Sequence, residues 1–172
     1  MTAPARRSRP THLLEVLEVE RRAPHLVRLW AGGDGLAAFE GSTATDRYVK
    51  LWFTQPGHDI EAPWDVEEVR ATLAPEQLPV SRTYSVPVVL PGRVAIDVVV
   101  HGDVGLAGPW AARAQPGDRI VFSGPGGGYA PDPTADAHLL AGDESALPAI
   151  GAALAWMAEH APLAVGTAYV EV

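Results

Sequence analysis

Residues 80–113 read VSRTYSVPVVLPGRVAIDVVVHGDVGLAGPWAAR, and this stretch says most about both the fold and the function. Two segments rich in apolar and β-branched residues, Val80–Val89 and Val94–His101, are separated by Pro91-Gly92 and predict two strands. A glycine-containing turn follows, and residues 107–114 then predict a short helix. The stretch therefore predicts two strands and a helix that begins next to glycines.

The segment Arg82-Thr83-Tyr84-Ser85 carries side chains suited to a ligand. Side chains alternate between the two faces of a strand, so Arg82 and Tyr84 share one face and Ser85 lies on the other. A guanidinium beside an aromatic ring suits a ligand that has a phosphate and a flat ring. Gly105 and Gly108 allow close approach of the backbone, and the helix they open offers N–H groups to an anion. The combination predicts a site for a phosphate-bearing ring compound.

The rest of the first two thirds of the chain also predicts strands. Short apolar segments alternate with turns such as Arg22-Ala23-Pro24 and Gln55-Pro56-Gly57. Residues 64–73 have Val66, Val69 and Leu73 at helical spacing and predict a helix. The further predicted strands are His12–Val19, His25–Ala31, Arg47–Phe53 and Arg119–Ser123. Six short strands favour an antiparallel barrel or sandwich over residues 12–123, preceded by a flexible tail, residues 1–11.

The composition of the sequence changes near residue 124. The Gly/Pro-rich run that begins there predicts a linker over residues 124–134. Beyond it, strand His138–Ala141, helix Ser145–His160 and strand Gly166–Val172 predict a βαβ unit with parallel strands, with Ser145 as the N-cap of the helix. A parallel pair of strands cannot cover both of its own faces. Residues 135–172 are therefore expected to begin an α/β domain, in a longer protein or a shortened relative.

Composition limits the classes of function. The net charge of −8, from 13 basic and 21 acidic residues, argues against nucleic acid as the main partner. The absence of cysteine excludes disulfides and thiolate-bound metals in this chain, and the six histidines lack ligand spacing, so no metal site is predicted. No apolar run approaches the ~20 residues of a membrane span. A cytoplasmic protein without membrane insertion is expected, and no catalytic side chain is assigned.

The sequence resembles the siderophore-interacting protein family in motifs that lie along nearly all of residues 12–172. The members of this family are FAD-dependent ferric-siderophore reductases of the ferredoxin-reductase-like group. The motifs, in order, are R-x-Y-[ST] at Arg82, H-G-D at His101, G-x-A-x-x-W-A at Gly105, P-G-D, G-P-G-G and AGDESALPAI over Ala141–Ile150. The resemblance implies an antiparallel FAD-binding β-barrel over residues 12–123. The start of an α/β nicotinamide-binding domain would follow it over residues 135–172.

The same resemblance implies a set of cofactor contacts. Arg82 would contact the FAD phosphate, Tyr84 would lie against the isoalloxazine or ribityl region, and Ser85 would lie near the N5 edge. The backbone around Gly108, where the family often has serine, would hold the pyrophosphate. The implied cofactor-binding residues are Arg82, Thr83, Tyr84, Ser85, His101, Gly105, Ala107 and Gly108, and those facing the nicotinamide and substrate are Asp143, Glu144 and Ser145.

The resemblance also implies a reaction, in which NAD(P)H reduces a cytoplasmic ferric siderophore through FAD and iron leaves as Fe(II). A flavin can connect a two-electron donor to a one-electron acceptor, and such chemistry needs neither cysteine nor bound metal. Two alternatives remain open at this point. One is a general flavin or ferric reductase without siderophore preference, and the other is a shortened FAD-binding module without catalysis.

Overall fold

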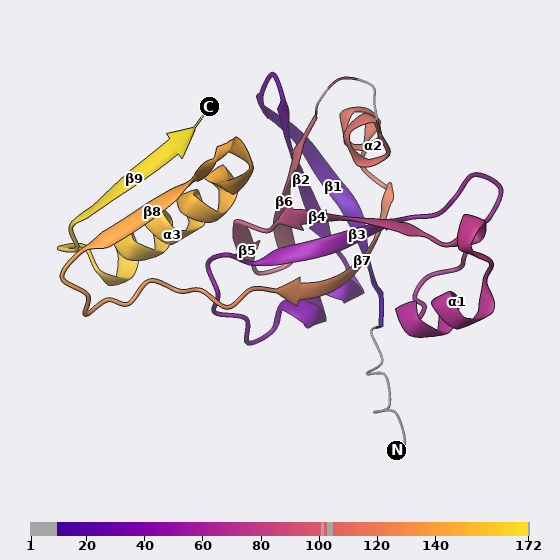
Figure 1. The fold of residues 1–172 in the computed structure, drawn as a ribbon, viewed down its shortest axis with the longest axis horizontal. Coiled ribbons are helices and arrows are strands. Elements are labelled where there is room, and N and C mark those ends of the chain that lie inside the picture. The colour runs from indigo at the N-terminus through magenta and orange to yellow at the C-terminus, as the bar shows by residue number, and fades with distance from the viewer. Residues whose placement is uncertain (1–9, 101, 103–104, 172) are drawn as a thin grey trace, which may run out of the picture.

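The computed structural model describes residues 10–100, 102 and 105–171. It contains a large sheet with short helices around it and a small β8–α3–β9 unit beside it (Figure 1). Residues 1–9 of the predicted tail, and His101, lie outside the described ranges. Thr11, predicted to belong to the tail, is buried, and its N–H and hydroxyl both donate to the carbonyl oxygen of Trp64 at 2.8 Å. The folded part therefore begins before β1.

The large sheet has seven strands, and every neighbouring pair in it is antiparallel, as predicted. Their order across the sheet is β4-β3-β7-β1-β2-β6-β5. The strands are β1 His12–Ala23, β2 Leu26–Gly32, β3 Tyr48–Phe53, β4 Val80–Ser85, β5 Val88–Leu90, β6 Arg93–Val99 and β7 Arg119–Gly126. The predicted strand Val80–Val89 is thus two strands, because Pro87 has no N–H and cannot take part in continuous strand pairing.

The sheet curls but is not closed by hydrogen bonds. Strands β4 and β5 are its opposite edges, yet Ser85 and Val88 are only three residues apart in the chain. Three residues span at most about 11 Å, so the two edges must come near each other. The prediction of an antiparallel barrel is therefore right for the direction of the strands, but the barrel is not closed, because β4 and β5 do not pair. Between them, Val86 donates its N–H to the carbonyl oxygen of Arg47, just before β3, at 2.8 Å.

One apolar core fills the concave side of the sheet. Leu14, Leu29, Leu51, Ile96 and Phe122 are each at most 1% exposed. Phe39, from the 3-10 helix η1 (Asp34–Phe39), stacks on Phe122 with ring centroids 5.6 Å apart, and Ala111 joins the core from helix α2. Phe39 and Ala111 thus add to the core from outside the sheet, which buries apolar surface although its edges stay unpaired.

The helices in this part of the chain are short. Helix α1 (Val66–Thr72) begins at Asp65, whose carboxylate accepts hydrogen bonds from Glu67 and Glu68, the usual arrangement at a helix start. Besides η1, this part also contains the 3-10 helix η2 (Pro75–Gln77) and α2 (Ala107–Arg113), the latter in the predicted position. No helix in the described ranges is long and apolar enough to cross a membrane.

The last part of the chain forms the predicted βαβ unit. Strands β8 (His138–Asp143) and β9 (Gly166–Glu171) pair in parallel, and α3 (Leu147–His160) connects them. The predicted N-cap is wrong: Ser145 lies in the 3-10 turn η3 (Glu144–Ala146), and α3 begins after Ala146 without a side-chain cap. Asp143 caps η3 instead, because its carboxylate can reach the N–H of Ser145.

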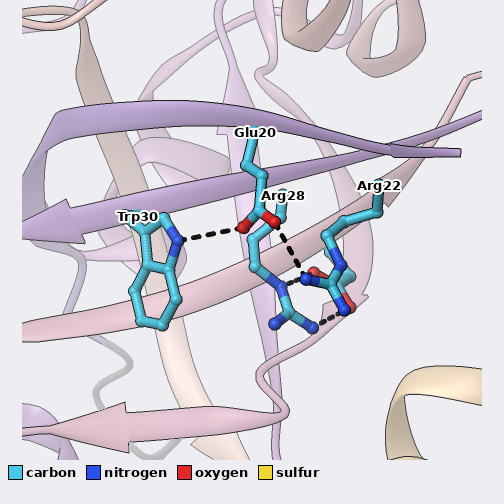
Figure 2. Close-up of polar contacts among 5 residues, drawn as sticks. Glu20, Arg22, Arg28 and Trp30 are labelled. Atoms are coloured by element: carbon cyan, nitrogen blue, oxygen red, sulfur yellow. Dashed lines mark hydrogen bonds and ion pairs between the residues drawn. The ribbon is translucent and has the colours of Figure 1, made fainter.

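A buried ion pair joins two strands of the large sheet. Arg28 of β2 and Asp97 of β6 are Cα partners, and the guanidinium donates two hydrogen bonds to the carboxylate at 2.7 and 2.9 Å. The Asp97 side chain is only 2% exposed, and these bonds raise the pKa of Arg28. Figure 2 shows Arg28 beside Glu20, which accepts hydrogen bonds from Arg22 and Trp30.

Replacing Arg28 with alanine should destabilise the fold by about 3–5 kcal/mol, because the Asp97 carboxylate would remain buried without its partner. Urea unfolding followed by circular dichroism at neutral pH measures this change. Arg22→Ala is the matched control, since the Arg22–Glu20 pair is exposed and should contribute at most about 1 kcal/mol. Equal destabilisation by the two substitutions would contradict the structural role of the Arg28–Asp97 pair.

Candidate functional site

Strand β4 carries the Arg82–Ser85 motif at one edge of the sheet. Its register against β3 pairs Arg82 with Leu51 and Tyr84 with Val49, both of which are buried. Ser85 pairs with Tyr48, which is exposed. Cross-strand partners share a face, so Arg82 and Tyr84 lie on the core-facing side and Ser85 on the other, as the alternation predicts. Because β4 is an edge strand, a ligand can approach this motif from beyond the sheet.

The two side chains of this face differ in burial. Tyr84 is partly buried and packs against the core, and burial raises the pKa of its phenol, an effect that the nearby Arg82 opposes. Arg82 is exposed, and among the described residues its guanidinium has one hydrogen bond, to the carbonyl oxygen of Ser81 at 2.9 Å. Because this one hydrogen bond restrains it only weakly, the Arg82 guanidinium can turn toward an anionic ligand. The neutral phenol of Tyr84 offers an apolar ring surface.

The start of α2 provides a backbone suited to close approach. Gly105 has a φ of +90°, and a Cβ at this position would meet no atom within 4 Å. Leu106, the residue before the helix, makes no side-chain hydrogen bond to the first turn. The open space that the described residues leave beside Gly105, and the first N–H groups of the helix at Ala107 and Gly108, fit a phosphate. His101, predicted close to the same ligand, lies outside the described residues.

A cavity of about 410 Å³ lies between β3, β7 and the first turn of α2. Its lining includes Leu51, Trp52, Phe53, Leu106, Trp110 and Arg119. Phe53 and Trp110 meet edge to face with ring centroids 5.7 Å apart. These aromatic walls could not be predicted from the sequence, since Trp52 and Phe53 come from β3 and Trp110 from α2, with no regular spacing between them.

The cavity lies beside neighbours of the two predicted parts of the site, but its lining contains no residue of β4 and none of Gly105, Ala107 and Gly108. Leu51 lines it and is the cross-strand partner of Arg82, while Leu106 directly follows Gly105. Strand β4 and the start of α2 are some twenty residues apart in the sequence, and the cavity brings together a cross-strand neighbour of the one and the residue that precedes the other.

Asp143, Glu144 and Ser145 lie apart from this region, at the carboxyl end of β8. The Asp143 carboxylate accepts hydrogen bonds from the N–H and hydroxyl of Ser145 at 2.9 and 2.6 Å, and these bonds lower the pKa of Asp143. Among the described residues, the hydrogen bonds of this turn stay within it and do not reach β4 or α2. The structure therefore does not bring these three residues into the Arg82–Gly108 region.

Comparison with known proteins identifies relatives of the whole chain. The model of the siderophore-interacting FAD-binding domain matches residues 15–129. The uncharacterized protein Rv2895c of Mycobacterium tuberculosis is 46% identical over 169 residues, which cover 95% of this chain and 58% of that protein. The NADPH-dependent ferric-chelate reductase of Escherichia coli is 37% identical over 140 residues, covering 80% of this chain and 53% of that enzyme. The chain thus spans little more than half the length of these relatives.

Solved structures agree with the fold. A siderophore utilization protein from T. fusca superposes with a TM-score of 0.72 at 35% identity, covering 93% of this chain and 60% of that one. A ferredoxin NADP+ reductase from Neisseria gonorrhoeae superposes with a TM-score of 0.64 at 15% identity, covering 94% and 57%, which shows a shared fold alone. The predicted ferredoxin-reductase-like fold class is confirmed.

The burial of Tyr84 can be tested without any ligand. Burial disfavours the phenolate, so the Tyr84 phenol should ionise above pH 10, the ordinary value for tyrosine. The stability that the neutral phenol contributes should be present below pH 10 and lost as the pH rises through its folded pKa. Alkaline titration by ultraviolet absorbance, with Tyr84→Phe subtracted from the wild type, isolates this group. Tyr169→Phe, which removes an exposed phenol, is the control, and a Tyr84 midpoint at or below 10 would contradict the burial argument.

Proposed function

The chain belongs to the siderophore-interacting FAD-binding domain family, and on this premise we propose that it binds FAD in a reductase that transfers electrons from NAD(P)H to a ferric siderophore. The observation that carries the proposal is the shared face of Arg82 and Tyr84 on an edge strand. The proposed substrate is a small ferric chelate in the cytoplasm. We assign FAD binding to residues 12–123 and a part of the NAD(P)H site to residues 135–172, joined by residues 124–134.

The residues present fit FAD. The Arg82 guanidinium is exposed and has no carboxylate partner among the described residues, so a phosphate can take that place. Tyr84 presents a neutral, partly buried ring for packing against the flavin. The space beside Gly105 lets the backbone N–H groups of Ala107 and Gly108 reach a pyrophosphate. Thr83 and Ser85, on the opposite face of β4, would contribute hydroxyl groups at the strand edge, and by resemblance Ser85 lies near the flavin N5.

Bound FAD would supply the chemistry that joins a two-electron donor to a one-electron acceptor. In the balanced reaction, one NAD(P)H and two ferric ions give NAD(P)+, one proton and two ferrous ions. Reduction weakens the hold of hard oxygen ligands, which prefer the ferric ion, so iron can leave the chelate. The protein's part is to bind and orient. Arg82 holds the phosphate, Tyr84 covers one face of the ring, and Asp143, Glu144 and Ser145 lie on the proposed nicotinamide and substrate side.

Two sources of support agree with this reaction. The Escherichia coli relative is an NADPH-dependent ferric-chelate reductase, and the T. fusca protein serves siderophore utilization. A general ferric reductase would reduce many chelates at similar rates, whereas a siderophore reductase would discriminate among them. Oxidation of NADPH by the FAD-loaded chain, measured with no iron, with simple ferric chelates and with ferric siderophores, separates these functions. FAD binding without iron-dependent oxidation would support a binding module instead.

Arg82→Ala should weaken FAD binding about 10- to 150-fold, because a charge-assisted hydrogen bond contributes about 1.5–3 kcal/mol. The measurement is a titration of the purified chain with FAD, followed by visible absorption after desalting. Arg70→Ala is the matched control, since Arg70 is exposed on α1 and pairs with Glu67 of the same helix. If Arg82→Ala folds normally by circular dichroism and keeps wild-type affinity, the proposed phosphate contact is wrong.

A further inference from the structure

The segment that connects β7 to β8 is attached by the Asp46 side chain to the residues just before β3. The Asp46 carboxylate accepts hydrogen bonds from the N–H groups of Gly128 and Tyr129, both at 2.9 Å from the same oxygen, Oδ1. Asp46 precedes β3, whereas Gly128 and Tyr129 lie more than eighty residues later. The predicted linker, residues 124–134, is therefore not a free chain at these positions, and its first residues, 124–126, belong to β7.

The neighbouring Thr45 attaches the same segment from its carbonyl side. Thr45 is 3% exposed, and its N–H donates to the carbonyl oxygen of Tyr129 at 2.7 Å. Its hydroxyl donates to the same oxygen at 3.3 Å. Residues 45 and 46 thus hold the N–H groups of residues 128 and 129 and the carbonyl group of residue 129, an arrangement that we call the 45–129 clamp. Such a double attachment restricts the direction in which the chain leaves the sheet.

The glycines of this segment fit the clamp. Gly127 has a φ of +135°, and a Cβ there would lie 3.0 Å from Asp46 Oδ1 and 3.2 Å from the Arg47 Cα. A Cβ on Gly126 would overlap the Tyr48 ring. These glycines permit a close approach between the connecting segment and the start of β3, a role distinct from flexibility.

The clamp lies between the βαβ unit and the proposed cofactor edge, by which we mean the edge strand β4 with its neighbour β3. Tyr48, two residues after Asp46, is the Cα partner of Ser85 on β4. On the other side, the chain runs from Tyr129 to β8 without further helix or strand (Figure 1). The path of the chain toward β8, and with it toward Asp143–Ser145, therefore starts from where residues 128 and 129 are held.

We propose that Asp46 is a positioning residue. It holds the connecting segment so that the βαβ unit keeps a fixed place relative to the cofactor edge. The link to electron transfer rests on the proposed function, whereas the clamp itself does not. Hydride transfer requires near-contact geometry, so a unit that moves freely would react more slowly even when FAD binds normally.

Spin-label distance measurements test the clamp without any cofactor. The chain has no cysteine, so Glu68→Cys on α1 and Glu159→Cys on α3, both exposed, provide two unique label sites. The wild type should give one narrow distance distribution, and Asp46→Ala should broaden it. Asp46→Asn keeps an oxygen acceptor at the same place and should retain most of the narrow distribution.

Asp132→Ala is the matched control. Its carboxylate also accepts two hydrogen bonds, but both come from Thr134 within the connecting segment. It should leave the distance distribution narrow. A second readout is chymotryptic cleavage after Tyr129, which should be roughly tenfold faster in Asp46→Ala, since charge-assisted hydrogen bonds no longer oppose local opening. A narrow distribution with wild-type cleavage in a folded Asp46→Ala, or equal effects of Asp132→Ala, would overturn the clamp.

The link to the reaction has its own measurement. In Asp46→Ala the affinity for FAD should stay within about twofold of the wild type, while reduction of the bound flavin by NADPH should slow roughly tenfold. A broadened distance distribution with an unchanged rate would overturn the positioning role. Failure of the wild type to bind FAD would overturn the proposed function, and the distance and cleavage results would still decide the clamp.

Discussion

The hydrogen bonds of β3 to β4 on one side and β7 on the other determine where each part of the candidate site lies. The pairing with β4 sets Arg82 opposite Leu51 and Tyr84 opposite Val49, so these two side chains point toward the core side. The pairing with β7 brings Gly126 opposite Tyr48, so the chain leaves the sheet beside Ser85. A shift of one residue in the β3–β4 register would move Arg82 and Tyr84 to the other face of the sheet. The same shift in the β3–β7 register would move the end of β7 away from Ser85.

The edge position of β4 suits a binding strand. A central strand would have neighbours on both sides, whereas β4 has β3 on one side only. Tyr84 is half-buried, so its ring packs against the core and is still accessible. Arg82, two residues earlier on the same strand, is exposed to solvent. Pro87 keeps β5 from continuing β4, which leaves the sheet unclosed near the motif.

Much of this arrangement could be predicted from the sequence, because strands and turns carry local patterns. The antiparallel strands, the short α2 and the parallel βαβ unit all follow from alternation, helical spacing and turn residues. Features that depend on distant contacts could not be predicted in this way. The aromatic cavity collects Trp52, Phe53 and Trp110 from two elements, and the cap of Asp143 on η3, in place of the predicted Ser145, depends on where the preceding strand ends.

The connecting segment shows why composition alone misleads. A run of glycine and proline is typical of a flexible linker, yet two of its glycines lie where a side chain would collide with Asp46 or Tyr48. The same absence of a Cβ therefore serves close packing here. Since residues 45–48 attach this segment and also begin the strand that pairs with β4, the cofactor edge and the route to the βαβ unit share one short piece of chain. FAD affinity and domain placement must therefore be measured separately for a variant in this piece before a change in its activity is assigned to either.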